Sequence, residues 1–381
     1  MQYKRQKQKS IENRAGYIKS MISLIMESDG ITQAELAHSL EISNPTMIGY
    51  LKKLREKELL DESGRLDSDG GRRPRSIRVN GDSHFSVGIH IKPDYYLLAV
   101  VNMKNEVKKT RQVDMPFRNR MEYWKDVNDS VNEILEQNGL ASRAVGIGIS
   151  VPCAVRIEEN DILFAYSAQI GEINGTRLSQ VQPYFDLPLC VEGEAAAAGY
   201  RYSVMNGVEN LAYLMVNDGI EGAYIQKNEI SRGNNGFMGM YGHITIHPDG
   251  QECFCGKKGC LEVYCSTDRL REHAGGSLKE YWKLLERKDQ EAVKIFDEYL
   301  NNMAIGVANI LIMMDCSVII GGEIVDGIEK YASFMDRALR PSLNLIWTQE
   351  HFGTMAEIDS GDIYNPAVGA AMMQNMRFMT S

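Results

Sequence analysis

GHITIHPDGQECFCGKKGCLE, residues 242–262, is the stretch that decides how this chain folds. Three cysteines fall within eight residues of it and follow His243: Cys253, Cys255 and Cys260. One imidazole and three thiolates complete a tetrahedral zinc shell, and such a closed shell is structural rather than catalytic. Buried free cysteines are the alternative, but the spacing favours a metal. The sequence therefore predicts one structural zinc ion per chain, with His247 excluded as a fifth ligand.

This stretch resembles the signature of the ROK family (repressors, open reading frames and sugar kinases). In that family a Gly-His precedes a Cys-x-Cys-Gly-x-x-Gly-Cys-Leu-Glu run, and the resemblance extends over nearly the whole chain. It implies that His243 both binds zinc and faces a sugar hydroxyl, and that Glu262 contacts the sugar as well. The zinc loop would then support one wall of a ligand pocket.

The composition is typical of a cytoplasmic globular protein with more than one domain. At 381 residues, the chain is long enough for two or three domains with substantial cores. No apolar run approaches twenty residues, so no membrane span is expected. The basic N-terminus, MQYKRQKQKS, lacks the following apolar segment of a signal peptide. The four cysteines outside residues 242–262 are scattered, as expected in a reducing compartment.

Charge is distributed unevenly along the chain. The net charge is -9, yet residues 1–80 contain 15 Lys and Arg against 11 Asp and Glu, and the remainder contains 27 against 40. A mildly basic N-terminal segment on an acidic body indicates that only this segment contacts a polyanion.

The N-terminal segment has the pattern of a helix-turn-helix. Apolar residues at helical spacing predict a first helix over residues 10–28. Thr32-Gln-Ala-Glu35 has the pattern of a capping box that opens a second, short helix. Ser43 then caps a third helix at about residues 44–57, with a proline in its first turn. Two helices joined by such a brief turn are typical of DNA-binding domains.

The third helix has one apolar and one polar face. Met47, Leu51 and Leu54 fall on the same side and are expected in the core. The opposite side is small, polar and basic, which suits a helix that enters a major groove. The residues predicted to contact DNA from this helix are Asn44, Thr46, Gly49, Lys52 and Lys53. A helical bundle without a DNA-binding role is the alternative for this segment alone.

A wing with an arginine cluster follows the third helix. Strands are predicted from Leu59–Leu60 and at Ser76–Asn80, with Gly-Gly-Arg-Arg-Pro-Arg at residues 70–75 between them. Glycine and proline keep this backbone extended, so its arginines can enter a narrow, A·T-rich minor groove. The predicted groove contacts are Arg72, Arg73 and Arg75. ROK repressors carry a similar winged head and Gly-Arg-Arg-Pro-like run, so we expect this segment to bind double-stranded DNA.

From Phe85 onward the periodicity alternates between strands and helices, which predicts two α/β lobes. The resemblance specifies the actin-like ATPase architecture of sugar kinases for these lobes. A long amphipathic helix is expected at Asp289–Met314 in the second lobe. The predicted divisions are a winged helix-turn-helix domain at 1–80, a first lobe at 81–190 plus 366–381, and a second lobe with the zinc site at 191–365.

The segments that bind ATP phosphates in ROK kinases are altered here. The first phosphate turn of the family, Asp-x-Gly-Gly-Thr, is matched by His90-Ile-Lys-Pro-Asp94, which lacks both glycines and gains a proline without an amide donor. The second turn is matched by Asn217–Ala223, where Asp218 and Glu221 would repel a phosphate. The adenosine-side turn, Gly321-Gly-Glu323, is retained in part. We therefore expect no ATP binding.

The sugar-binding residues of the family are partly retained. Kinases carry Val-Glu-Asn-Asp-Ala, whereas residues 191–195 read Val-Glu-Gly-Glu-Ala, so Glu194 replaces the catalytic aspartate. The extra methylene displaces the acid enough to misplace a general base. The family's glutamate three residues before the zinc histidine is Met240 here. The predicted ligand-binding residues, in a remodelled pocket, are Glu194, His243 and Glu262.

These features predict a DNA-binding transcriptional regulator of carbohydrate metabolism, a repressor without kinase activity. It would be a homodimer or tetramer whose winged heads bind a palindromic, A·T-rich operator. A carbohydrate-related effector bound between the lobes would re-orient the heads and weaken DNA binding. The alternatives are an ATP-dependent sugar kinase with an accessory DNA-binding head and a constitutive DNA binder that has lost its effector.

Overall fold

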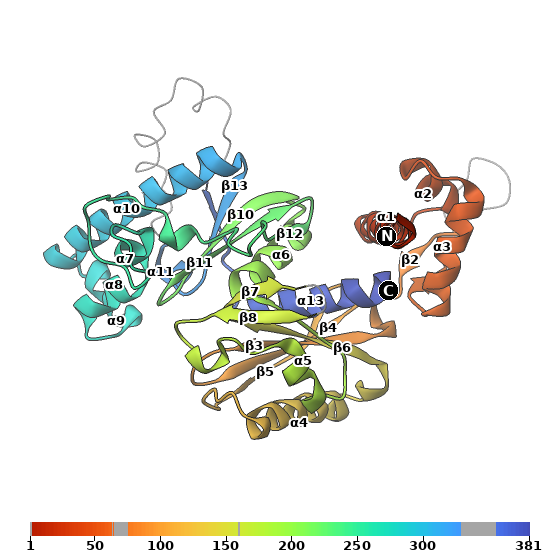
Figure 1. Ribbon diagram of the computed structural model, residues 1–381, viewed down its shortest axis with the longest axis horizontal. Helices are drawn as coiled ribbons and strands as arrows, with labels where there is room; N and C mark the ends of the chain where they lie inside the picture. The colour runs from red at the N-terminus through yellow and green to blue at the C-terminus, as the bar shows by residue number, and fades with distance from the viewer. Residues whose placement is uncertain (1, 63, 65–74, 159–160, 329–355) are drawn as a thin grey trace. The chain divides into compact units, whose positions relative to one another are not determined.

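A computed structural model of the protein describes residues 2–62, 64, 75–158, 161–328 and 356–381 (Figure 1). These residues divide into two compact units, each built around a five-stranded sheet. The first unit consists of Met1–Ile149, Ser179–Val191 and Ala370–Ser381, and the second of Ser150–Leu178 and Glu192–Gly369. Residues 150–178, which the sequence placed in the first lobe, thus group with the second unit. None of the described helices is both long enough and apolar enough to cross a membrane.

The first unit begins with a winged helix-turn-helix head. Its elements are α1 Gln2–Glu27, α2 Gln33–Ser39, α3 Asn44–Glu56, β1 Leu60–Asp61 and β2 Arg78–Val79. The predicted capping box opens α2: the Glu35 amide donates to Thr32 Oγ1 at 3.2 Å, and the Thr32 amide donates to the Glu35 carboxylate at 2.8 Å. Strands β1 and β2 pair antiparallel, with Leu60 opposite Val79, and form the base of the wing.

An apolar core holds the head together. Met47, Leu51 and Leu54 of α3 are fully buried, as their spacing predicted. They pack in one cluster with Leu36 of α2 and with residues of α1. The same cluster contains Met379 near the end of the chain. The core of the head therefore includes a residue more than three hundred positions away in the sequence.

The rest of the first unit is a sheet with helices. Its elements are β3 Phe85–Ile91, β4 Tyr96–Asn102, β5 Val107–Val113, α4 Met121–Gln137, β6 Ala144–Val151, α5 Leu178–Val181, β9 Leu189–Gly193 and α13 Asn365–Thr380. The strand order is β5-β4-β3-β6-β9. Gly148 of β6 lets α13 approach closely, because a Cβ there would overlap the carbonyl group of Ala370. The C-terminal helix thus packs directly on the first sheet.

The second unit contains the other five-stranded sheet and six of the described helices. Its strands are β7 Ala154–Ile157, β8 Ile162–Tyr166, β10 Asn210–Val216, β11 Ile220–Gln226, β12 Glu229–Ser231, β13 Ser317–Gly321 and β14 Ala356–Ile358. Its helices are α6 Glu194–Asn206, α7 Leu261–Cys265, α8 Asp268–Arg271, α9 Leu278–Glu286, α10 Gln290–Met314 and α11 Val325–Ile328. The strand order is β12-β11-β10-β13-β14, with β7 and β8 forming a separate hairpin.

Helices cover both faces of this second sheet. Alternate residues of β10 point to opposite faces, as the two-residue period of a strand requires. Leu211 and Tyr213 pack with α6 on one face, whereas Leu214 and Val216 pack with α7 and α10 on the other. Burial on both faces explains why β10 is apolar almost throughout.

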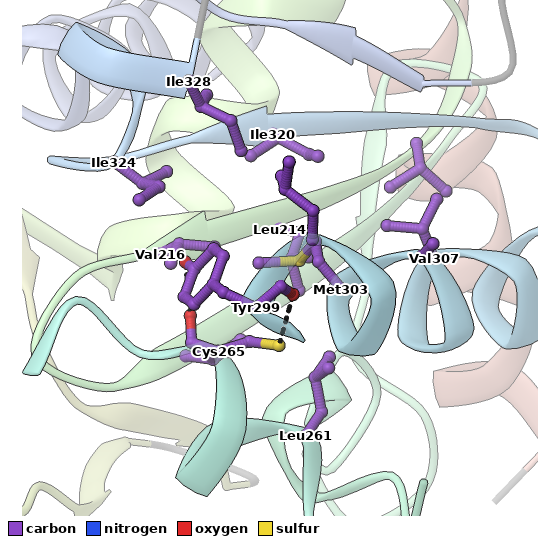
Figure 2. Packing of buried hydrophobic residues seen from close by; sticks show 14 of the residues in the cluster. Leu214, Val216, Leu261, Cys265, Tyr299, Met303, Val307, Ile320, Ile324 and Ile328 are labelled. Carbon is purple, nitrogen blue, oxygen red and sulfur yellow. Dashed lines mark hydrogen bonds between the residues drawn. The ribbon is translucent and has the colours of Figure 1, made fainter. Parts of the chain in front are cut away.

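The α10 face also contains buried polar contacts (Figure 2). The hydroxyl of Tyr299 in α10 donates to the carbonyl of Cys265 in α7 at 2.7 Å, and Cys265 Sγ donates to the carbonyl of Tyr299 at 3.7 Å. These bonds satisfy polar groups that would otherwise be buried without partners. They also fix α7, which directly follows the cysteine-rich stretch, against the long helix α10.

Candidate functional site

The cysteine loop, residues 242–262, brings four side chains to one point. The ligand atoms of His243, Cys253, Cys255 and Cys260 all lie within 4.8 Å of one another. His243 Nδ1 lies 3.7 Å from Cys253 Sγ, and Cys255 Sγ lies 3.7 Å from Cys260 Sγ. A disulfide would place two sulfurs about 2 Å apart, whereas 3.7 Å matches the edge of a tetrahedron with Zn–S arms of about 2.3 Å. These four residues could therefore hold a tetrahedral metal ion.

Two glycines shape the cysteine loop. Gly256 and Gly259 have φ angles of 85° and 71°, a region that side-chain-bearing residues rarely adopt. A Cβ at Gly259 would in addition overlap the carbonyl of His247. His247 Nε2 lies 2.8 Å from Asn302 Oδ1. His247 is thus engaged elsewhere, in agreement with its exclusion from the predicted ligand set.

A cavity of about 350 Å³ lies beside the cysteine loop, and all of its lining residues belong to the second unit. This volume is within the range of small-molecule sites. His243 and Glu262, both predicted to face a ligand, line this cavity. The Nδ1 atom of His243 lies with the cysteine sulfurs, so Nε2 is the ring nitrogen available to a ligand.

Glu262 is positioned by the turn between β10 and β11. Its Oε2 accepts a hydrogen bond from the Ile220 amide at 3.4 Å. Burial raises the pKa of the Glu262 carboxyl to about 7, although the Ile220 amide acts in the opposite direction. At neutral pH the group can therefore either donate to or accept from a ligand hydroxyl.

The glutamates of residues 191–195 have different surroundings. Glu194 opens α6 with 1% exposure, and its Oε1 accepts a hydrogen bond from the Asn217 side chain at 3.2 Å. The residues that line the cavity do not include Glu194, whereas they include Glu192. Glu192 forms an ion pair with Arg232, another lining residue. No sequence pattern pointed to Arg232, and Glu192 was identifiable only as part of the Val-Glu-Gly-Glu-Ala motif at residues 191–195.

Helix α3 presents its predicted DNA-contacting residues to solvent. Asn44, Thr46, Gly49 and Lys52 are exposed, and Lys53 is partly exposed. Ile48 is 50% exposed on the same helix, a residue that the sequence prediction missed. Ile48 could have been identified from the sequence, because its helical spacing from Pro45 and Lys52 places it on the same side of the helix. An exposed aliphatic residue at this place suits contact with a thymine methyl group.

The arginines of the wing fall into different categories. Arg72 and Arg73 lie outside the described residues, so their contacts with DNA remain a prediction. Arg75 is exposed. Arg78 instead donates to the carbonyl of Asp29 at 2.6 Å, and its role is to hold the wing to the end of α1.

Comparison with known proteins decides the family. The ROK family model matches residues 86–376, and a model described as winged helix-turn-helix DNA-binding matches residues 16–61. The chain belongs to the ROK family. The predicted fold, a winged helix-turn-helix domain followed by the actin-like sugar-kinase fold of ROK proteins, is confirmed.

Relatives of this ROK protein include regulators of transcription. The xylose repressor of Bacillus subtilis strain 168 is 28% identical over 257 residues, which cover 66% of this chain and 66% of that protein. The DNA-binding transcriptional dual regulator NagC of Escherichia coli K12 is 21% identical over 260 residues, covering 68% of this chain and 64% of NagC. The matches therefore span just under two thirds of the length of these relatives.

Solved structures agree on the ROK fold. A ROK family transcriptional regulator, described as a homolog of the E. coli MLC protein, superimposes with a TM-score of 0.78 at 16% identity, over 96% of this chain and 98% of that one. The ROK glucokinase of Streptomyces griseus superimposes with a TM-score of 0.61 at 21% identity, over 76% of this chain and 98% of that one. Repressors and kinases thus share the fold, so the site itself has to distinguish them.

An arginine of this ROK chain joins the turn after β10 to the turn after β13. Arg271 of α8 forms ion pairs with Asp218 and with Glu323, and its Nη1 lies 3.7 Å from an Asp268 oxygen. Asn217 adds a second link, because its Oδ1 accepts a hydrogen bond from the Glu323 amide at 2.9 Å. Three carboxylates around one guanidinium leave this region with an excess of negative charge.

Arg271→Leu tests whether the ion pairs of Arg271 stabilise the second unit. At pH 7 we expect a loss of about 1–3 kcal/mol, because hydrogen bonds to charged groups are removed and three carboxylates are left close together. Burial and the nearby Asp218 already raise the pKa of Asp268, so acidification should neutralise the Asp268 carboxylate and reduce the loss. Urea unfolding at pH 7 and pH 4.5, each against the unchanged protein, measures both effects.

Arg269→Leu on the same helix is the matched control, because among the described residues the Arg269 guanidinium pairs only with the exposed Glu272, at 3.8 Å. We expect it to cost less than about 0.5 kcal/mol. Equal losses of unfolding free energy in the two variants would contradict a stabilising role for the Arg271 ion pairs. A loss for Arg271→Leu that is as large at pH 4.5 as at pH 7 would contradict it as well.

Proposed function

We propose that this protein is a DNA-binding transcriptional repressor whose affinity for its operator is controlled by a carbohydrate-related effector. One observation carries the proposal. A winged head with a small, polar and basic exposed helix face shares a chain with a ROK unit whose cavity is lined by His243 and Glu262. The names of the two relatives, xylose repressor and NagC transcriptional regulator, support the same conclusion. Such a regulator acts in the cytoplasm, where its operator lies.

The head is proposed to bind duplex DNA through α3 in the major groove and through the wing arginines in the minor groove. Lys52 and Lys53 would contact phosphates, and Asn44 and Thr46 would reach base edges. A single winged head reads only a short half-site. We therefore propose a homodimer or tetramer that binds a palindromic operator with A·T-rich flanks.

Gly49 offers the sharpest test of DNA binding by α3. A Cβ at this position would meet no atom within 4 Å in the described part of the chain, so Gly49→Ala should stabilise the head by about 0.5–1 kcal/mol. On the DNA-facing side, however, the added methyl group should hold α3 away from the groove. We expect affinity for the preferred operator, selected from a random duplex pool, to fall about tenfold or more.

Gly16→Ala is the control, because Gly16 is also exposed in a helix and its Cβ would also meet no described atom. This change should give similar stabilisation with unchanged DNA binding. Thermal unfolding and fluorescence anisotropy report the two quantities separately. Unchanged operator affinity in Gly49→Ala would exclude α3 as the groove-reading helix.

The effector is proposed to bind in the cavity without phosphoryl transfer. Arg271 and its carboxylates occupy the turns that would hold ATP phosphates, which supports the absence of kinase activity. Two buried polar atoms of lining side chains, Gln169 Oε1 and Arg232 Nε, have no hydrogen-bond partner among the described residues. Buried polar groups normally find partners, and a polyhydroxylated ligand could supply them.

Melting curves across a panel of sugars, each with and without ATP, test the effector proposal. At least one sugar should raise the melting temperature by several degrees at a hundredfold excess over its Kd, and the same sugar should weaken operator binding. ATP should add nothing, and no phosphorylated sugar should form. A phosphorylated product would favour the sugar kinase, whereas the absence of any sugar effect would favour a constitutive DNA binder.

We propose that the metal held by the cysteine loop is zinc, because three thiolates and one imidazole are its preferred structural ligands. Elemental analysis of the purified protein should find about one zinc per chain. Cys260→Ser should remove it and lower the melting temperature of the second unit by about 6 °C or more, assuming a loss of roughly 3 kcal/mol. Cys316→Ser, outside the cluster, should leave the zinc content unchanged. Protein that folds fully without zinc would refute this assignment.

A further inference from the structure

We infer that the effector cavity has an outer aromatic subsite, and that the effector is a glycoside with two rings rather than a free monosaccharide. The second ring is either another sugar or an aromatic aglycone, and both share a flat face with apolar C–H or π character. This inference rests on the proposed function, because it names the class of effector that the same cavity accepts.

The inner part of the cavity is polar. Its lining includes Glu262, the Glu192–Arg232 ion pair and His243, whose Nε2 atom is available to a ligand. Such groups donate to and accept from hydroxyls. These groups fit one sugar ring, whose hydroxyl groups would form hydrogen bonds with them.

The outer part of the cavity is apolar and aromatic, and we call it the rim. It consists of four lining residues that are unusually exposed for large apolar side chains: Tyr166 at 47%, Phe254 at 57%, Met238 at 37% and Met240 at 36%. Single exposed apolar residues are common, but a group of them at the edge of a cavity marks a binding surface. Covering them with a ligand would remove apolar surface from water, which is favourable.

The rings of the rim continue outward from the polar part. The Phe254 ring lies edge-to-face with His243 at a centroid distance of 5.3 Å, and nearly parallel to Tyr166 at 6.3 Å with an interplanar angle of 15°. A sugar ring that contacts His243 covers only the inner end of this row of three rings. The exposed surfaces of Phe254 and Tyr166 remain for a second ring, and flat apolar faces pack favourably on aromatic side chains.

The methionines of the rim, Met238 and Met240, can adapt to the second ring through their side chains. Methionine is flexible and polarizable, so it fits ligands of irregular shape. The rim therefore combines a fixed aromatic surface with an adjustable apolar one.

Isothermal titration of the full-length, zinc-loaded protein compares three series of probes: glucose, xylose and galactose; the disaccharides cellobiose, xylobiose and lactose; and the phenyl β-glycosides of the three monosaccharides. We expect a two-ring probe to bind at least tenfold more tightly than its monosaccharide. Tyr166→Ala should abolish that gain while changing monosaccharide affinity less than twofold. Tyr166→Phe keeps the ring and should retain the gain.

Ile157→Ala is the matched control on the same hairpin, since Ile157 is 55% exposed but does not line the cavity. It should leave all affinities unchanged. A gain confined to disaccharides supports the inference and identifies the second ring as a sugar, and a gain confined to phenyl glycosides identifies it as an aglycone.

Monosaccharides that bind as tightly as their glycosides, or a gain that survives Tyr166→Ala, would overturn the outer subsite and leave the proposed function intact. Failure of every probe to bind would overturn the subsite together with effector control, while operator binding by the same preparation would show that the DNA-binding part of the proposed function still holds.

Discussion

The cavity of the second unit depends on one constraint in the cysteine loop. Three thiols and an imidazole lie there within 4.8 Å of one another. Three cysteine side chains and an imidazole gathered in this way could hold a metal ion, and in the proposed repressor a bound zinc ion would stabilise the folded loop. The loop in turn supplies His243, Phe254 and Glu262 to the cavity. A structural site and a ligand site are thereby built from one segment, so loss of the metal would disturb recognition even though the metal takes no part in it.

The second unit has the fold that ROK repressors and sugar kinases share, and a group of charges joins two of its turns. The turn after β10 carries Asp218, the turn after β13 carries Glu323, and both carboxylates pair with Arg271. In the proposed repressor these contacts hold the turn that leads to Ile220, whose amide donates to Glu262. This charged region would then stabilise the wall of the effector cavity.

Coupling between effector and DNA requires a connection from the cavity-bearing unit to the head. Helix α13 begins with residues assigned to the second unit and ends in the first, where Met379 joins the core of the head. Lys57, which follows α3, donates to the carbonyl of Phe378 at 2.6 Å and to that of Ser381 at 2.9 Å. A covalently continuous helix that ends on the C-terminal cap of α3 is a physical basis for the proposed control of operator binding.

Local spacing was sufficient wherever the chemistry is local. The cluster of His243 and three cysteines lies within one short segment, the capping box spans four residues, and the buried face of α3 follows from the helical period, so the sequence determined each of them. The family signature likewise identified His243 and Glu262 as cavity residues, and the fold class followed from it.

The remaining features depend on segments that only tertiary structure brings together. Arg232 and Arg271 meet their carboxylate partners across 40 and 53 residues of sequence, and no periodicity predicts which charge will lie opposite another after folding. The motif did not reveal that Glu194 is enclosed at the start of α6 while Glu192 reaches the cavity, because side-chain direction depends on where the strand ends and the helix begins. Likewise, Tyr166 and Phe254 form one surface only because the β7–β8 hairpin and the cysteine loop fold against the same cavity.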